Sequence, residues 1–175
     1  SMFLTQASTN DLLHVVGVAD IDVDKARAAL HRTGWEASRY EAASLQEAAL
    51  SGSTHVGDDA DALIRHPAVE VVLEVTGNPL VGTHHAIRAI DEGKHVVMVN
   101  VEADCMVGPL LQRRAQAAGV VYSMAYGDQP ALICELVDWC RTVGFDVVAA
   151  GKGTKYLPEY NYSTPDTVWD YYGFT

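Results

Sequence analysis

The sequence lacks any apolar run near the roughly 20 residues that a bilayer span needs, and no basic start with an apolar core resembles a signal peptide. Basic residues are few: 12 Lys and Arg stand against 23 Asp and Glu, and the formal net charge is −11. Because nucleic-acid binding depends on neutralising phosphates with Lys and Arg, we expect neither a nucleic-acid partner nor a membrane partner.

Cysteine is also scarce, and Cys105, Cys134 and Cys140 form no C-x-x-C pair. This pattern favours buried, reduced thiols and a cytoplasmic protein over a disulfide framework. No H-E-x-x-H or cysteine-rich metal spacing occurs, and adjacent helical residues such as His84 and His85 point about 100° apart. We therefore expect no metal site and a structural or surface role for this histidine pair.

What is present is an unbroken alternation of strand and helix patterns from residue 14 to residue 151. Valine-rich strands that are apolar on both faces indicate a parallel sheet covered by helices, so we expect an α/β fold of the Rossmann type, with a doubly wound parallel sheet. The alternation of strand and helix patterns ends at residue 151, so we expect a nucleotide-binding domain over 1–150 and the start of a second domain over 151–175. We expect strands at 14–19, 54–56, 69–75, 94–101, 120–127 and 145–151, and helices at 23–33, 45–52, 58–66, 79–92, 104–118 and 128–144.

Asp20 ends the first predicted strand, just before a helical pattern. In dinucleotide-binding folds, a carboxylate at the end of the second strand bonds both hydroxyls of the adenosine ribose and disfavours the 2′-phosphate of NADP. We expect Asp20 to bind NAD in this way; the alternative is that it only caps the helix. Ile21 agrees with NAD, whereas Lys25 and Arg27 lie one turn further on and leave NADP open.

A glycine-rich phosphate loop should precede such a strand, and none does. The acidic residue of the fingerprint stands about 20 residues after the glycines, so the loop falls at or before Ser1. Residues 3–11 then represent the end of the helix that follows the loop. We expect a piece of a longer protein, whose first and central strand lies outside this sequence. The alternative is a complete chain in which another segment fills the centre of the sheet.

Thr76, Gly77, Asn78 and Pro79 follow the predicted strand 69–75. Open α/β sheets bind ligands at the carboxyl ends of their strands, and glycine permits close backbone approach. We therefore expect these four residues to contact the cofactor. The simpler interpretation is a turn with proline at the first helical position, and both can hold together.

Asn100, Val101 and Glu102 stand at the end of the next strand pattern, where we expect the nicotinamide end of the cofactor. Glu102 either orients a substrate hydroxyl or a lysine, or is a solvated carboxylate favoured by the helix dipole. Residues 127–130 follow a later strand and either line the cofactor pocket or form a helix cap.

Four stretches carry a resemblance by their order and spacing: "VVGVADIDVDKA", "VVLEVTGNP", "AIDEGKHVVMVNVEAD" and "GKGTKYLP". They resemble the NAD(P)-binding half of homoserine dehydrogenase-like oxidoreductases. The segment "YSMAYGDQPALICELVDWCRTVGF" is most similar to the bacterial members that carry a C-terminal SAF-type domain. The resemblance implies a nicotinamide-dependent dehydrogenase that forms a homo-oligomer, with most of its substrate domain absent from this sequence.

Two details of the resemblance concern the substrate. Family members usually have Asn-Lys where Asn100 is followed by Val101, and this departure argues against homoserine itself. The family's Gly-Thr-x-x-Tyr pattern has a looser counterpart in residues 153–156, which implies that Lys152 and Lys155 lie near the substrate.

We therefore expect hydride transfer between NAD, with NADP still open, and a small polar hydroxy or oxo compound related to sugar acids or amino acids. Lys152 is the first candidate to take the hydroxyl proton and Lys155 the second; the plain alternative is that they are surface lysines. Two other functions remain open. One is a regulatory module that senses NAD(H) without turnover, and the other is a sheet protein that binds another ligand, such as an acyl group, with Asp20 as a cap only.

Overall fold

The computed structural model describes residues 2–126, 129–151, 157–168 and 170. The chain forms two compact units, Ser1–Ala125 and Tyr126–Thr175. The helices of the first unit are α1 (Met2–Ala7), α2 (Val23–Arg32), α3 (Leu45–Ser51), α4 (Ala60–Arg65), α5 (Pro79–Asp91) and α6 (Val101–Ala118), with a 3-10 helix at Ala37–Tyr40. Its strands are β1 (Gly17–Ala19), β2 (His55–Gly57), β3 (Val71–Glu74), β4 (His95–Met98) and β5 (Tyr122–Met124). The second unit contains α7 (Gln129–Thr142) and a 3-10 helix at Pro158–Tyr162.

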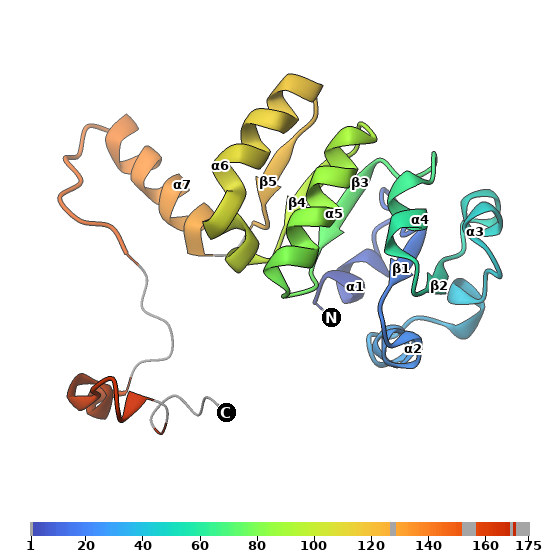
Figure 1. Ribbon diagram of the computed structural model, residues 1–175, viewed down its shortest axis with the longest axis horizontal. Coiled ribbons are helices and arrows are strands. Elements are labelled where there is room, and N and C mark those ends of the chain that lie inside the picture. The colour runs from blue at the N-terminus through green and yellow to red at the C-terminus, as the bar shows by residue number, and fades with distance from the viewer. Residues whose placement is uncertain (1, 127–128, 152–156, 169, 171–175) are drawn as a thin grey trace. The chain divides into compact units, whose positions relative to one another are not determined.

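All strand pairs are parallel, which confirms the α/β fold with a parallel sheet. β1 pairs with β2, and β3, β4 and β5 pair in that order (Figure 1). Among the described residues β1 and β3 form no ladder with each other, so the strands divide into two sheets. In a doubly wound sheet these two strands flank the first strand.

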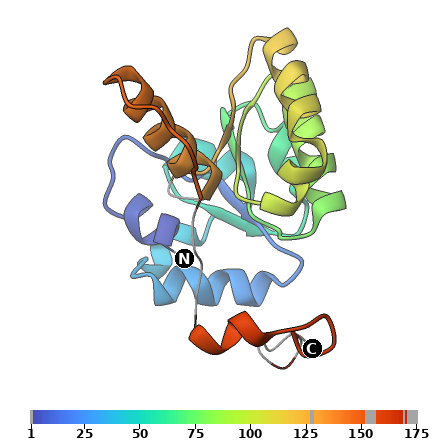
Figure 2. The same ribbon diagram turned by 90° about the vertical axis from the view of Figure 1, so that its left-hand side faces the viewer.

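Helices cover the sheets through three hydrophobic clusters (Figures 1 and 2). α1 and α2 pack on β1 and β2 around the fully buried Leu30 and the buried Trp35. α5 and α6 pack on the three-stranded sheet around Val96 and Met98, which face them from alternate positions of β4. A third cluster contains Val16 beside β1 and Val69 beside β3, so it joins residues next to both sheets.

Short polar side chains cap the N-termini of the helices. Asp22, Ser44 and Asp59 each accept a hydrogen bond from the main-chain N–H three residues ahead, at the starts of α2, α3 and α4. Such caps satisfy N–H groups that have no partner inside the helix. Asn78 and Asn100 cap α5 and α6 in the same way, and both lie at the ends of strands that the candidate site uses.

Several predicted elements are wrong in extent or kind. The segment 145–151 is no strand: among the described residues no strand pairs with it, and Phe145 and Val148 remain exposed. The strand predicted over 94–101 ends at Met98, and α6 begins at Val101 rather than at residue 104 because Asn100 supplies the cap. The strand predicted over 14–19 shortens to Gly17–Ala19, since only these residues pair with β2.

The expectation of buried thiols is also wrong for two of the cysteines. Cys105 and Cys134 are exposed and Cys140 is partly exposed, and all three are free. Burial depends on which face of a helix meets a neighbour, and α6 buries Ala103 and Leu111 while it presents Cys105 to solvent. The thiol count alone does not determine that orientation.

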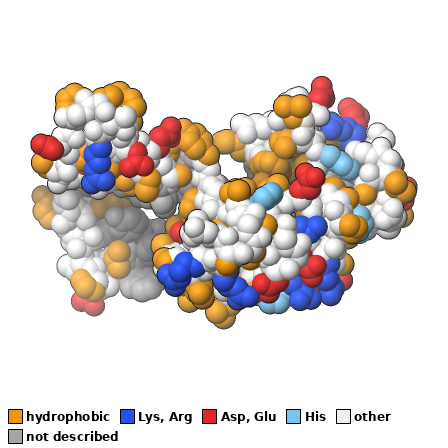
Figure 3. All heavy atoms as spheres, turned by 90° about the horizontal axis from the view of Figure 1, so that it is seen from above, with side chains coloured by type: hydrophobic (Ala, Val, Ile, Leu, Met, Phe, Trp, Pro, Cys, Tyr) orange, Lys and Arg blue, Asp and Glu red, His pale blue; other side chains and the backbone are white. Residues whose placement is uncertain are grey.

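Large apolar side chains also remain at the surface, where Figure 3 shows them mixed with charged groups of both signs. Val75 is 65% exposed just after β3, although the run to which it belongs reads as fully buried. Within the described part of the chain, no helix combines the length and apolar character needed to cross a membrane.

Candidate functional site

The carboxyl ends of β1, β3 and β4 carry the polar residues that the sequence predicts as the site. Parallel strands deliver their carboxyl ends to one edge of a sheet, and ligands of open α/β folds bind there. The structure places Asp20 directly after β1, the turn of residues 76–78 just beyond β3, and Asn100 beyond β4.

Asp20 is partly exposed and is held by two hydrogen bonds. Its main-chain N–H donates to the Gly57 oxygen at 3.0 Å, and its Oδ1 accepts from the Asp22 N–H at 2.9 Å. Asp22, and not Asp20, caps α2. Among the described residues the second oxygen of Asp20 accepts no hydrogen bond, so one carboxylate oxygen is available to a ligand.

The first two basic residues that follow Asp20, both in α2, differ in burial and in hydrogen bonding. Arg27 is partly buried, and its guanidinium donates to the Tyr40 main-chain oxygen at 3.4 Å. Lys25 is exposed on α2. Ile21, the residue after the carboxylate, is 99% exposed and offers no charge to a phosphate.

The turn after β3 combines a strand end with a helix start. Gly77 adopts a φ of +71°, a conformation that glycine tolerates best, and a Cβ there would meet no atom within 4 Å. Asn78 Oδ1 accepts from the N–H groups of Leu80 and Val81, and Pro79 is the first helical residue. The predicted turn with proline at the first helical position is therefore confirmed, and the backbone at Gly77 is open to an approaching ligand.

Asn100 is 2% exposed, and both ends of its amide are engaged within the protein. Nδ2 donates to the Asn78 main-chain oxygen at 2.9 Å, and Oδ1 accepts from the Ala103 N–H at 3.1 Å. Val101 is the partly buried first residue of α6, and Glu102 is exposed in its first turn. Asn100 therefore joins the two turns, and Glu102 lies exposed at the start of α6.

Glu74, the last residue of β3, is a functional candidate that sequence reasoning missed. It is 2% exposed, its Oε1 accepts from the Thr76 N–H at 3.1 Å, and His85 Nδ1 lies 3.5 Å from the same oxygen. Burial raises the pKa of the carboxyl, but contacts with His85, Thr76 and Asn100 outweigh burial and hold the pKa below its ordinary value. A carboxylate inside the apolar run "VVLEV", in phase with the inward-facing Val72, was the available signal.

His85 therefore has the structural role expected of the histidine pair. Lys152 and Lys155 lie outside the described residues, as do Gly127 and Asp128.

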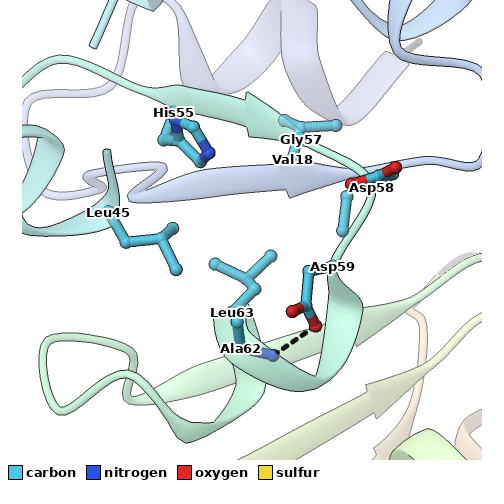
Figure 4. A pocket seen from close by; sticks show the side chains of 9 residues that line it. Val18, Leu45, His55, Gly57, Asp58, Asp59, Ala62 and Leu63 are labelled. Carbon is cyan, nitrogen blue, oxygen red and sulfur yellow. Dashed lines mark hydrogen bonds between the residues drawn. The ribbon is translucent and has the colours of Figure 1, made fainter. Parts of the chain in front are cut away.

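A small cavity of about 90 Å³ lies between β1, β2 and the helices α3 and α4 (Figure 4). Leu45 and Leu63 point into it, and Asp59 at its rim is engaged in capping α4 through Ala62. Asp20, Gly77 and Asn100 do not line it. The cavity is a packing gap beside the strand-end site rather than part of it. The described residues contain no group of three or more His, Cys, Asp or Glu placed to hold a metal ion.

The arrangement fits a dinucleotide in two respects. A ribose supplies hydroxyl donors, and the free oxygen of Asp20 is an acceptor at the predicted place. The backbone of the 76–78 turn is open at Gly77, where a nucleotide can approach without meeting a side chain.

Comparisons with known proteins agree with this fit. Residues 3–123 match the family described as "Homoserine dehydrogenase, NAD binding domain", and residues 127–173 match "Oxidoreductase DRL, catalytic domain". The chain is 35% identical over 75 residues to a homoserine dehydrogenase of Methylobacillus glycogenes, a match that covers 42% of this chain and 18% of that protein.

A solved structure, that of the putative oxidoreductase yvaA from Bacillus subtilis, shares the fold with a TM-score of 0.51 at 19% identity. The match covers 81% of this chain and 35% of the Bacillus chain, so this sequence spans well under half the length of both relatives. The homoserine dehydrogenase family match covers most of the chain and coincides with the unit that carries Asp20, Gly77 and Asn100. This chain therefore belongs to the family described as homoserine dehydrogenase, NAD binding domain.

Proposed function

We propose that this chain is part of an NAD-dependent dehydrogenase that oxidises a small polar alcohol, related to sugar acids or amino acids, or reduces the corresponding carbonyl. The observation that carries the proposal concerns Asp20: one of its two carboxylate oxygens accepts no hydrogen bond among the described residues. Asp20 lies at the same strand ends where the Gly77 backbone is open. When bound, the nicotinamide supplies the hydride chemistry. The protein binds and orients the cofactor and moves the hydroxyl proton.

The preference for NAD over NADP rests on charge. A carboxylate that accepts both ribose hydroxyls repels a 2′-phosphate, and the neighbouring Ile21 offers it no compensation. The Arg27 guanidinium donates to the Tyr40 main-chain oxygen, whereas Lys25 is exposed on α2. We therefore infer that NADP binds more weakly.

The proton transfer is assigned to Lys152, with Lys155 second and Glu102 as an orienting carboxylate. A lysine can take the hydroxyl proton as hydride leaves when its environment favours the neutral amine. This assignment rests on the resemblance of residues 151–156 to the family pattern. Its test is replacement of each lysine by methionine, which keeps the apolar stem and removes the amine.

A second candidate function is an NAD(H) sensor without turnover, and one observation favours it. Where the family usually has lysine, Val101 is a partly buried helical residue with no proton to transfer. A sensor binds the cofactor but oxidises no substrate. In that case, replacing Lys152 or Lys155 by methionine alters only the surface charge and leaves cofactor binding as it is.

The deciding experiment has two steps on the full-length protein. NADH fluorescence titration measures binding first, and a panel of hydroxy acids and polyols is then screened for NAD reduction. For an enzyme, we expect submillimolar binding, turnover of at least one compound, and a kcat reduced about 10²-fold or more by Lys152→Met with the NAD dissociation constant unchanged. Binding without turnover supports the sensor, and absence of binding rejects both functions.

A further inference from the structure

One oxygen of a core carboxylate is left without a partner directly beneath the candidate cofactor site. Glu74 Oε1 is engaged by Thr76 and His85, but Oε2 is fully buried and has no hydrogen bond of ordinary geometry among the described residues. Desolvating a charged oxygen is costly unless something nearby compensates. Contacts of the carboxylate with His85, Thr76 and Asn100 compensate for its burial.

Gly82 makes the room that this carboxylate needs. A Cβ on Gly82 would lie 2.6 Å from Glu74 Oε2 and 2.6 Å from Asn100 Nδ2, so both polar groups converge on the surface of α5 that has no side chain. Asn100 Nδ2 also donates to the Asn78 oxygen, which accepts from the Gly82 N–H at 2.8 Å as well. Glu74, Gly82 and Asn100 thus form one buried polar contact between β3, α5 and β4.

This buried contact holds in place the turns after β3 and β4, whose backbone lies at the edge of the sheet. Glu74 fixes the turn after β3 through the Thr76 N–H, and Asn100 fixes the start of α6 through the Ala103 N–H. A dinucleotide whose adenosine ribose is held at Asp20 extends its second nucleoside over β3 and β4, because these strands lie beyond β1 in the wound order.

We infer that Glu74 is a positioning residue which, through Thr76 and Asn100, holds the turns after β3 and β4 in place for the nicotinamide half of the cofactor. This inference rests on the proposed function. Glu74 itself touches no cofactor: its carboxylate is buried, and it acts by holding the backbone of the two turns that face the ligand.

The test variant is Glu74→Gln in the full-length protein. Glutamine keeps the volume, but one end of its amide becomes a donor, which then opposes either the Thr76 N–H or the Asn100 amide. Dissociation constants are measured by titration for NAD⁺ and for ADP, which retains the adenosine ribose and the pyrophosphate but lacks the nicotinamide nucleoside. We expect binding of NAD⁺ to weaken about tenfold and binding of ADP to change less than about twofold.

The matched control is Glu70→Gln, which removes an exposed carboxylate just before β3 and leaves both constants unchanged. Equal weakening of NAD⁺ and ADP means that Glu74 only supports the fold, and this overturns the inference. Unchanged binding of both ligands also overturns it while the proposed function stands. A wild-type protein that binds neither ligand rejects the proposed function instead.

A second variant keeps the test decisive if Glu74→Gln does not fold. Gly82→Ala retains the carboxylate but places a methyl group between Glu74 and Asn100. Alanine favours the helical conformation more than glycine does, so α5 itself is not weakened. The inference requires the same selective loss of NAD⁺ affinity, and an unselective loss or no loss contradicts it.

Discussion

The Asn100 side-chain amide donates to the Asn78 main-chain oxygen at 2.9 Å, and this hydrogen bond joins the turn after β4 to the turn after β3. Both residues are also helix caps: Asn78 for α5 and Asn100 for α6. Two asparagines therefore hold the turns at the sheet edge that carries the candidate site, and Glu74 is buried beside them.

Replacing Asn100 tests this support. Asn100→Ala removes a buried donor and a helix cap together, so we expect the free energy of unfolding to fall by about 1–3 kcal/mol in urea titrations. Asn10→Ala is the control, since Asn10 is exposed and its side-chain Oδ1 accepts from the Leu12 N–H. It changes stability by no more than about 0.5 kcal/mol. Equal losses in the two variants contradict the special role of Asn100.

Asp20→Asn tests the cofactor contact without dismantling the strand end. The asparagine oxygen can still accept from the Asp22 N–H, but the charge is gone, so we expect NAD⁺ binding to weaken by about 1 kcal/mol or more. Discrimination against NADP⁺ falls at the same time, because the repulsion of the 2′-phosphate disappears. Asp22→Asn retains a good cap and leaves both affinities as they are. An Asp20 variant that binds like the wild type removes the ribose contact from the proposal.

The charge on Glu74 makes stability depend on pH in a defined direction. The carboxyl pKa in the folded protein lies below the ordinary value of 4.5, so its contribution to stability is complete above pH 4.5. That contribution is lost as the pH falls through the lower folded pKa. The difference in unfolding free energy between wild type and Glu74→Gln is therefore largest near neutral pH and shrinks below pH 4.5. A constant difference from pH 3 to 7 argues against a charged Glu74, and Glu70→Gln provides the reference.

Tyr122 offers a test of packing away from the cofactor edge. Its hydroxyl donates to Asp104 Oδ1 at 2.7 Å, and burial together with this carboxylate raises the pKa of Tyr122 well above the usual range. Tyr122→Phe leaves the acceptor unpaired and lowers the free energy of unfolding by about 1–3 kcal/mol, with NAD⁺ binding unchanged. Tyr162→Phe, at a side chain that is 79% exposed, has no measurable effect on stability.

Much of the fold was predictable because it rests on local patterns. Strand and helix alternate at the predicted places in the first unit, since valine runs, capping residues such as Ser44 and Asp59, and helix-ending glycines such as Gly52 and Gly119 act within a few residues. The segment 145–151 failed for the opposite reason: its composition suits a strand, but a strand also needs a partner.

The candidate site was likewise predictable only in part. Asp20 and residues 76–78 could be placed at a strand-end site because parallel strands deliver their carboxyl ends to one edge. Nothing in the sequence indicated that both ends of the Asn100 amide form hydrogen bonds inside the protein. Glu74 was missed because a carboxylate in an apolar run gives no sign of which distant groups will compensate for its burial.

The sequence by itself determined the order of elements, the caps and the acidic strand end, because each depends on neighbours close in the chain. Only the tertiary structure decided that β1 and β3 lie in separate sheets, that Gly82 makes room for Glu74, and that Asn100 reaches Asn78 across 22 positions. These relationships join residues from different elements. Their energies depend on burial and on orientation, which exist only after the chain has packed.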